Sequence, residues 1–111
     1  KVLTKNNLFL LLDIAHAMVT AHNKNISYND YIGSLPLDKL IQLHICQPTL
    51  PDGGIARDSH NEPNNEMYNE VIRLINKYST IKYLTIEYYK DKDILIKSIK
   101  KLRQLIDQIN E

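Results

Sequence analysis

Six side chains of this 111-residue sequence could bind metal ions, because each lies at the end of a predicted strand or in the loop that follows it. They are carboxylates and imidazoles: Asp13, His16, His44, Asp58, His60 and Glu87. In a parallel α/β sheet or barrel, the carboxyl ends of the strands share one face, and active sites form there. We therefore expect these six groups to converge on one site.

The donor types indicate which metal would bind. Imidazole and carboxylate suit zinc, iron or manganese, whereas a thiolate site needs more than the single cysteine present. Six ligands exceed what one tetrahedral ion uses, so we expect two or more ions that share bridging carboxylates.

Each candidate ligand also has a simpler interpretation when it is taken alone. Asp13 could cap a turn, His44 could be a hydrogen-bonded core histidine, and the loop residues Asp58 and His60 could be exposed. Glu87 is harder to explain in this way, because a carboxylate that ends an apolar strand needs a partner once it is buried. The repeated placement after successive strands favours the metal site.

Other polar residues near the strands receive different interpretations. Cys46 follows His44 by two residues on the same strand face, and we expect a small buried side chain rather than a ligand. His22 lies further from a strand end, so we expect it at the surface or behind the ligands. The sequence has no glycine-rich phosphate loop and no nucleophile triad spacing, which argues against kinases, dinucleotide dehydrogenases and triad hydrolases.

The elements that must position these groups follow from the hydropathy pattern. Continuous apolar runs that end in an ionisable residue predict buried strands. Apolar stripes predict helices, and Ser27 and Asp91 are expected to cap the starts of two of them. The predicted strands lie near residues 8–13, 40–45 and 82–87, and the predicted helices near 27–35, 64–78 and 92–109. Strands that alternate with helices predict an α/β fold with a parallel sheet. We expect residues 47–65, which hold three prolines, to form a long irregular loop.

Three parallel strands would leave two unpaired edges, so we expect the sheet to continue in other strands of a longer polypeptide. The first residue, Lys1, is not a methionine, in keeping with that expectation. A net charge of +1 argues against nucleic-acid and membrane partners. No apolar run is long enough to span a bilayer and no signal peptide is evident, so we expect a cytoplasmic protein.

Four segments together resemble the C-terminal part of the multinuclear non-heme iron-dependent oxidative enzymes, a family first described as a domain of unknown function. The segments are LLLDIAH (10–16), QLH (42–44), DSHNEPNNEM (58–67) and TIEY (85–88). The resemblance implies a (β/α)8 barrel of the xylose-isomerase-like kind, of which this chain forms the last three βα units. It also implies that Asp13, His16, His44, Asp58, His60 and Glu87 match ligands of two or three irons.

The same resemblance implies an activity and partners. Members of the family oxidatively modify cysteine, or sometimes other residues, of ribosomally made precursor peptides, often with a small partner protein that presents the peptide. The N-terminal remainder of the barrel would carry the other ligands. After His44 the family commonly has a small residue, then glycine and an aromatic residue or histidine, whereas this sequence continues with Ile45-Cys46-Gln47-Pro48.

Three alternatives stay open. Trinuclear-zinc apurinic endonucleases of the same superfamily also show Asp-x-x-His, a strand-end His, Asp-x-His and a strand-end Glu. Their Asp-x-His loop continues into a glycine-rich stretch, where this sequence has Asn61-Glu62-Pro63-Asn64. Sugar isomerases are the second alternative, and zinc or manganese could replace iron. The third is a non-catalytic barrel fragment or a subunit that completes a split barrel.

Overall fold

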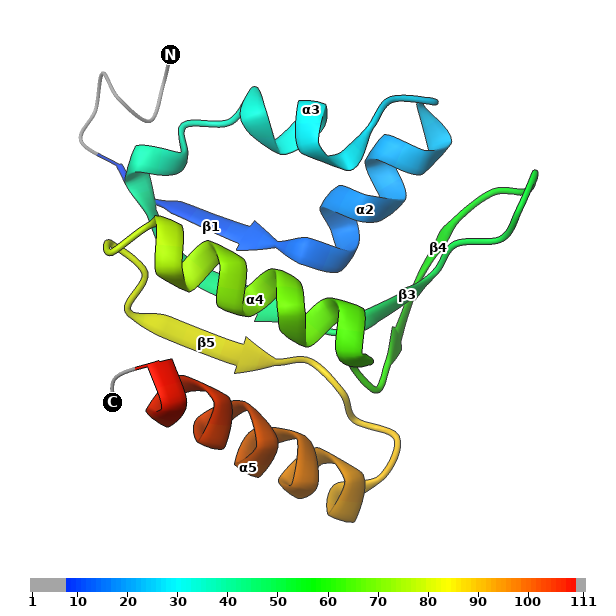
Figure 1. Ribbon diagram of the computed structural model, residues 1–111. Helices are drawn as coiled ribbons and strands as arrows, with labels where there is room; N and C mark the ends of the chain where they lie inside the picture. Colours follow the sequence, from blue (N-terminus) through cyan, green and yellow to red (C-terminus); the bar gives the residue numbers. More distant parts are fainter. Residues whose placement is uncertain (1–7, 110–111) are drawn as a thin grey trace.

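The computed structural model describes residues 8–109 and has a three-stranded parallel sheet beside a two-stranded antiparallel hairpin (Figure 1). The sheet has the order β1-β2-β5 and consists of β1 (Leu10–Asp13), β2 (Leu40–Ile45) and β5 (Tyr83–Ile86). The described helices are α2 (Ile14–Asn23), α3 (Tyr28–Gly33), α4 (Asn65–Lys77) and α5 (Lys92–Ile109), with a short 3₁₀ helix, η1 (Leu37–Lys39). The hairpin consists of β3 (Gln47–Thr49) and β4 (Arg57–Asn61). This architecture confirms the predicted α/β class and its parallel sheet.

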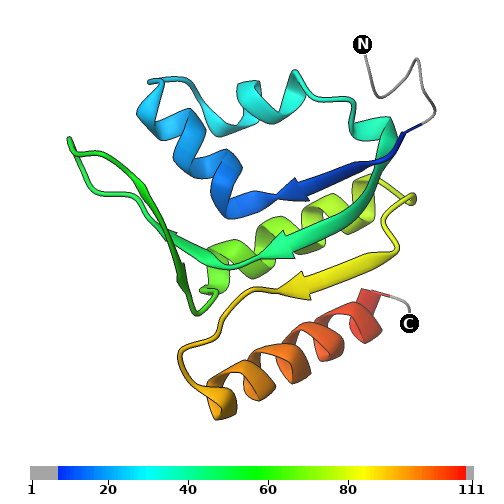
Figure 2. The ribbon, with the colours of Figure 1, turned by 180° about the vertical axis from the view of Figure 1, so that it is seen from behind.

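The core lies between the sheet and helix α4. Leu43 and Ile45 of β2 are fully buried, as are Met67, Val71 and Leu74 of α4. The apolar side chains of α4 recur at steps of three and four residues, which places them on one face of the helix. Seen from behind, the opposite face of the sheet has no helix across it in the described part of the chain (Figure 2). One face of the sheet is therefore packed against α4, and the other is open within the described residues.

Local capping explains where the helices begin. The Ser27 hydroxyl accepts a hydrogen bond from the Asp30 amide at 3.0 Å, and Asn64 Oδ1 accepts one from the amide of Met67 at 3.0 Å. Asp91 Oδ1 accepts in the same way from the amide of Ile94, at 3.2 Å. These caps satisfy amides that have no partner within the first turn of a helix. The caps expected at residues 27 and 91 are confirmed.

Two predictions about local structure were wrong. Residues 14–23 form helix α2, although the hydropathy pattern indicated no helix before residue 27. The buried face of α2 is built largely from Ala15, Ala17 and Ala21, whose small side chains give a weak apolar stripe. Residues 47–65 are not an irregular loop, because they contain the β3–β4 hairpin and the first residue of α4. The predicted helix near 27–35 is shorter, at 28–33.

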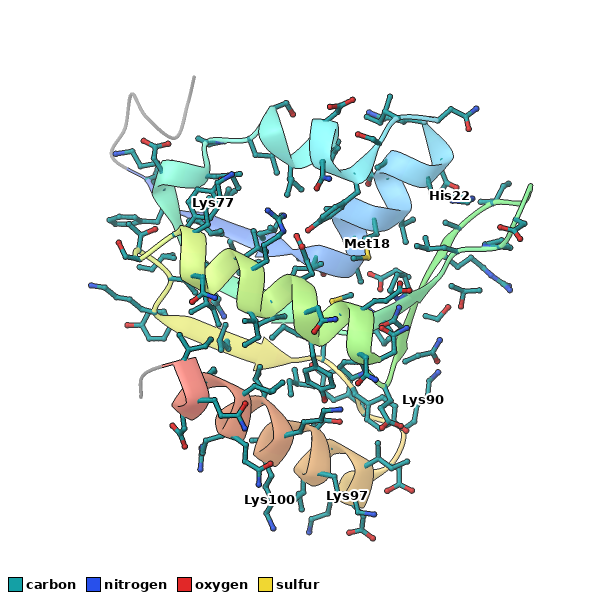
Figure 3. All side chains as sticks on the ribbon, viewed as in Figure 1. Met18, His22, Lys77, Lys90, Lys97 and Lys100 are labelled. Carbon is teal, nitrogen blue, oxygen red and sulfur yellow. The ribbon has the colours of Figure 1, made fainter. Side chains whose placement is uncertain are left out.

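Strands β1 and β5 form the two edges of the sheet within the described residues. Large apolar side chains in or next to these strands are exposed: Phe9, just before β1 (65%), Leu11 in β1 (45%) and Tyr83 in β5 (58%). The parallel order and the helical crossovers are consistent with successive βα units of a (β/α)8 barrel. No helix within residues 8–109 combines the length and the hydropathy required to cross a membrane. On α5, Lys97 and Lys100 point away from the sheet (Figure 3).

A hydrogen bond between two helices holds α3 against α4. The Tyr28 hydroxyl donates to Glu70 Oε2 at 2.6 Å, and the Arg73 guanidinium donates to both oxygens of the same carboxylate at 2.7 Å. Burial, followed by the hydrogen bond to Glu70, raises the pKa of Tyr28 well above its usual value. Tyr28 is therefore held as a neutral donor to a charged acceptor.

We expect Tyr28→Phe to lower the free energy of unfolding by about 1.5 kcal/mol, because it removes a hydrogen bond to a charged group. Above a pH of about 10 the unfolded state of the unaltered protein loses the proton of Tyr28 before the folded state does. The difference in the free energy of unfolding between the unaltered protein and the variant therefore shrinks as pH rises. Urea unfolding at neutral and alkaline pH measures both effects. Tyr31→Phe is the matched control, and an equal loss of stability there would contradict the prediction.

Candidate metal centre

The carboxyl ends of the three parallel strands lie side by side at one end of the sheet. In the parallel register Asp13 pairs with His44, and His44 pairs with Thr85. The Glu87 amide extends the ladder by donating to the Ile45 carbonyl at 2.8 Å. Parallel strands point the same way, so the residues that end them come close together although they are far apart in the sequence.

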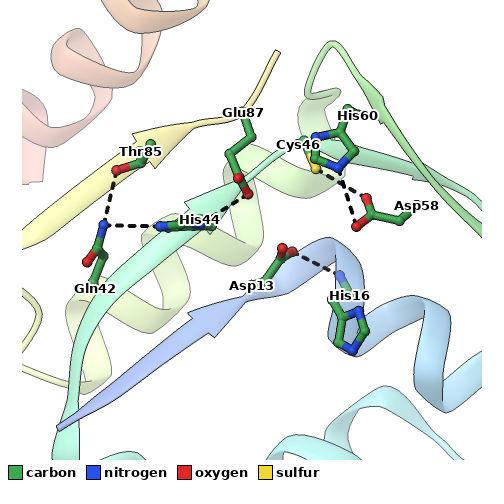
Figure 4. A network of polar contacts seen from close by, with 9 residues as sticks. All are labelled: Asp13, His16, Gln42, His44, Cys46, Asp58, His60, Thr85 and Glu87. Carbon is green, nitrogen blue, oxygen red and sulfur yellow. Dashed lines mark hydrogen bonds and ion pairs between the residues drawn. The ribbon is translucent and has the colours of Figure 1, made fainter. Parts of the chain in front are cut away.

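His44 and Glu87 form the first pair of candidate ligands. Nδ1 of His44 lies 3.1 Å from Oε1 of Glu87. On the other side of the ring, the Gln42 side-chain amide contacts Nε2 of His44 at 3.1 Å and donates to the Thr85 hydroxyl at 3.2 Å (Figure 4). Gln42 and Thr85 therefore fix the orientation of the imidazole, with Nδ1 toward Glu87.

Asp13 combines two roles at the end of β1. Its Oδ1 accepts a hydrogen bond from the His16 amide at 3.0 Å and so caps helix α2. The Asp13 carboxylate also approaches Cys46 and Glu87, and their donor atoms all lie within 4.8 Å of one another. The His16 side chain is exposed, and its ring points away from this cluster (Figure 4). His16 is the one predicted ligand whose ring does not lie close to the other predicted ligands.

Asp58 and His60 reach the site from the hairpin. Oδ2 of Asp58 lies 3.5 Å from Nε2 of His60, and both form a second compact group with Cys46, again within 4.8 Å. His60 has a φ of 49°, in the left-handed region that costs energy for residues other than glycine. Asp58 and His60 are two residues apart on β4, a spacing that places both side chains on the same face of a strand.

Helix α2 holds the hairpin in place. The Asn23 side chain accepts from the Ala56 amide at 2.8 Å and donates to the Ala56 carbonyl at 3.3 Å. Nε2 of His22 lies 2.9 Å from the Gly54 carbonyl oxygen. His22 is thus a support for the hairpin and belongs to neither donor group.

The Cys46 thiol lies between the two groups and is completely buried. Its Sγ donates a long hydrogen bond to Oδ1 of Asp58, at 3.7 Å. Burial raises the pKa of Cys46 to about 12, and the negative charges of Asp58, Asp13 and Glu87 add to the effect. Burial first, and the neighbouring carboxylates second, keep the cysteine a neutral thiol.

The spacing of the donors fits a shared metal ion. Two donor atoms that are each about 2.1 Å from one ion lie about 3.0 Å apart at a right angle and about 3.4 Å apart at the tetrahedral angle. The contacts of 3.1 Å for His44 with Glu87 and 3.5 Å for His60 with Asp58 are close to these two values. Oε1 of Glu87 is buried and accepts no hydrogen bond of good geometry within residues 8–109, although Nδ1 of His44 lies 3.1 Å away. A buried carboxylate oxygen without a donor is costly, and a cation would satisfy it.

The pattern of strand-end residues did not reveal the supporting residues. Gln42 could have been found from its place two residues before His44, on the same face of the same strand. Asn23 gave no local signal, because its partner is 33 residues away in the hairpin.

The fold and this cluster define an α/β protein whose carboxylates and imidazoles gather at the carboxyl end of a parallel sheet, where α/β enzymes form their active sites. Residues 1–111 match the model of a family described as RiPP precursor modification enzyme MbnB/TglH/ChrH, where RiPP denotes a ribosomally made peptide that is modified after translation. The chain belongs to this family, which confirms the resemblance found in the sequence. No curated protein and no solved structure gives a significant match.

We expect Asn23→Ala to loosen the hairpin without unfolding the sheet, because it removes both hydrogen bonds to Ala56. Amide hydrogen exchange at residues 50–57 should become at least about 10-fold faster, corresponding to the loss of about 1.4 kcal/mol of local stability. Exchange in β2 should stay unchanged. Asn29→Ala, on the exposed surface of α3, is the control. If the hairpin of Asn23→Ala is protected from exchange as well as the hairpin of this control, Asn23 does not tether it.

Proposed function

We propose that the full protein uses a site of two or three irons to oxidise a ribosomally made precursor peptide, at cysteine in the first instance. The observation that carries the proposal is the convergence of candidate ligands from β1, β2, β4 and the end of β5 in a member of this peptide-modifying family. The proposed ligands are Asp13, His16, His44, Asp58, His60 and Glu87. Iron, when bound, supplies the oxygen-dependent redox chemistry of such a reaction.

The residues of this chain contribute charge and geometry to that site. Asp13, Asp58 and Glu87 supply negative charge that offsets the charge of the cations. Gln42 and Thr85 hold the His44 ring so that Nδ1 faces Glu87. The His16 ring must rotate about its side-chain bonds to join the site, since its backbone already lies beside Asp13. Positioning before binding reduces the conformational entropy that ligation must overcome.

We further propose that other strands of a (β/α)8 barrel complete the sheet along the edges of β1 and β5. The exposed apolar side chains of Phe9, Leu11 and Tyr83 support this proposal. Large apolar side chains gathered at a sheet edge are covered in most folded proteins, because their exposure favours aggregation. The remaining ligands would come from those strands.

Two substitutions at Asp13 separate its role as a ligand from its role as a helix cap. Asparagine caps helices about as well as aspartate does, whereas alanine loses about 1 kcal/mol of stability. We expect Asp13→Asn and Asp13→Ala both to weaken Fe(II) binding by at least about 10-fold, the lower bound seen for residues that merely support ligands. Only Asp13→Ala should destabilise the metal-free protein.

Anaerobic titration with Fe(II) and urea unfolding measure these two effects. Asp30→Asn, at an exposed position in α3, serves as the control for a change of surface charge. Unchanged Fe(II) affinity in Asp13→Asn would show that Asp13 is only a helix cap.

The reaction itself is tested with the full protein, purified without oxygen and loaded with Fe(II). We expect two or three irons per chain by elemental mass spectrometry. Adding a cysteine-containing peptide encoded beside the gene should start oxygen uptake and change the mass of the peptide. A site that holds only zinc, with no oxygen uptake in the presence of the peptide, would refute the proposal.

A further inference from the structure

Cys46 is the one residue that belongs to both donor groups found within residues 8–109. It joins Asp58 and His60 in one group and Asp13 and Glu87 in the other, with the donor atoms of each group within 4.8 Å of one another. In the close view its sulfur points into the space that these side chains surround (Figure 4). The thiol therefore lies at the centre of the cluster.

The surroundings of Cys46 differ from those of an inert core cysteine. An inert buried cysteine packs as a small apolar side chain among other apolar groups. Cys46 instead faces three carboxylates, and its single S–H can donate to only one of them, Asp58. Oε1 of Glu87, in the same group, is buried, and its contact with Nδ1 of His44 at 3.1 Å lacks hydrogen-bond geometry. Sulfur and carboxylate oxygen donors meet around one point, and a metal ion bound there would supply the positive charge that offsets these carboxylates.

We propose that Cys46 is a sulfur ligand of the metal site. The inference rests on the proposed function, because it requires that the surrounding carboxylates and imidazoles bind metal. On binding, the S–H bond breaks, the proton is released to solvent, and a sulfur–metal bond forms. The ligand set then combines one soft donor with hard oxygen and nitrogen donors, which strengthens binding of iron, cobalt and zinc relative to manganese.

Co(II) is the probe that tests this inference, because thiolate bound to cobalt gives an intense sulfur-to-metal charge-transfer absorption in the near ultraviolet. The full protein is loaded with Co(II) without oxygen and compared with Cys46→Ser and Cys46→Ala. We expect the band in the unaltered protein and its loss in both variants. Cysteines elsewhere in the polypeptide cannot account for a band that disappears on changing Cys46. Co(II) affinity should also fall about 10-fold or more in Cys46→Ala.

Circular dichroism and urea unfolding of the metal-free variants check that each still folds, and the serine variant keeps nearly the same side-chain volume. Bound cobalt without the charge-transfer band in the unaltered protein would overturn the inference and leave the proposed function standing. The same holds if the band persists in Cys46→Ser. Failure of the unaltered protein to bind either Co(II) or Fe(II) would refute the proposed function and this inference together.

Discussion

Parallel pairing of β1, β2 and β5 is the constraint on which the rest of this structure depends. Strands that run in the same direction must be joined by crossovers, and here helices α2, α3 and α4 lie in those crossovers. The same pairing brings the ends of all three strands to one edge, so Asp13, His44 and Glu87 meet there. An antiparallel sheet of the same strands would separate them. The packed face and the polar cluster are thus two results of one backbone arrangement.

The sequence was most informative where a residue depends on its own strand or helix. Apolar runs predicted β1, β2 and β5, and a hydroxyl or carboxylate before an apolar stripe predicted the caps at Ser27 and Asp91. The fold class and the family followed from these local patterns. Four of the six predicted ligands, together with Cys46, make up the two donor groups, and His44 adjoins them through Glu87.

The features that the sequence did not predict depend on contacts over long distances in the chain. The hairpin is stabilised partly by Asn23. The alanine side chains of α2 can be recognised as a buried face only once the elements that cover them are known. The central place of Cys46 also required the structure, because a lone cysteine after a strand is most often an ordinary buried residue. Its position relative to Asp58 depends on the fold of the hairpin, which local hydropathy does not encode.

The tether between Asn23 and Ala56 has a thermodynamic consequence for the candidate site. The hairpin is joined to the sheet through the chain at β2 and again through helix α2, so Asp58 and His60 are kept near Asp13 before any ion arrives. An ion bound by residues of both the hairpin and the sheet would add a third connection between them. Thermodynamic coupling is reciprocal. The free energy that the tether adds to ion binding is therefore the same free energy by which a bound ion stabilises the hairpin against opening.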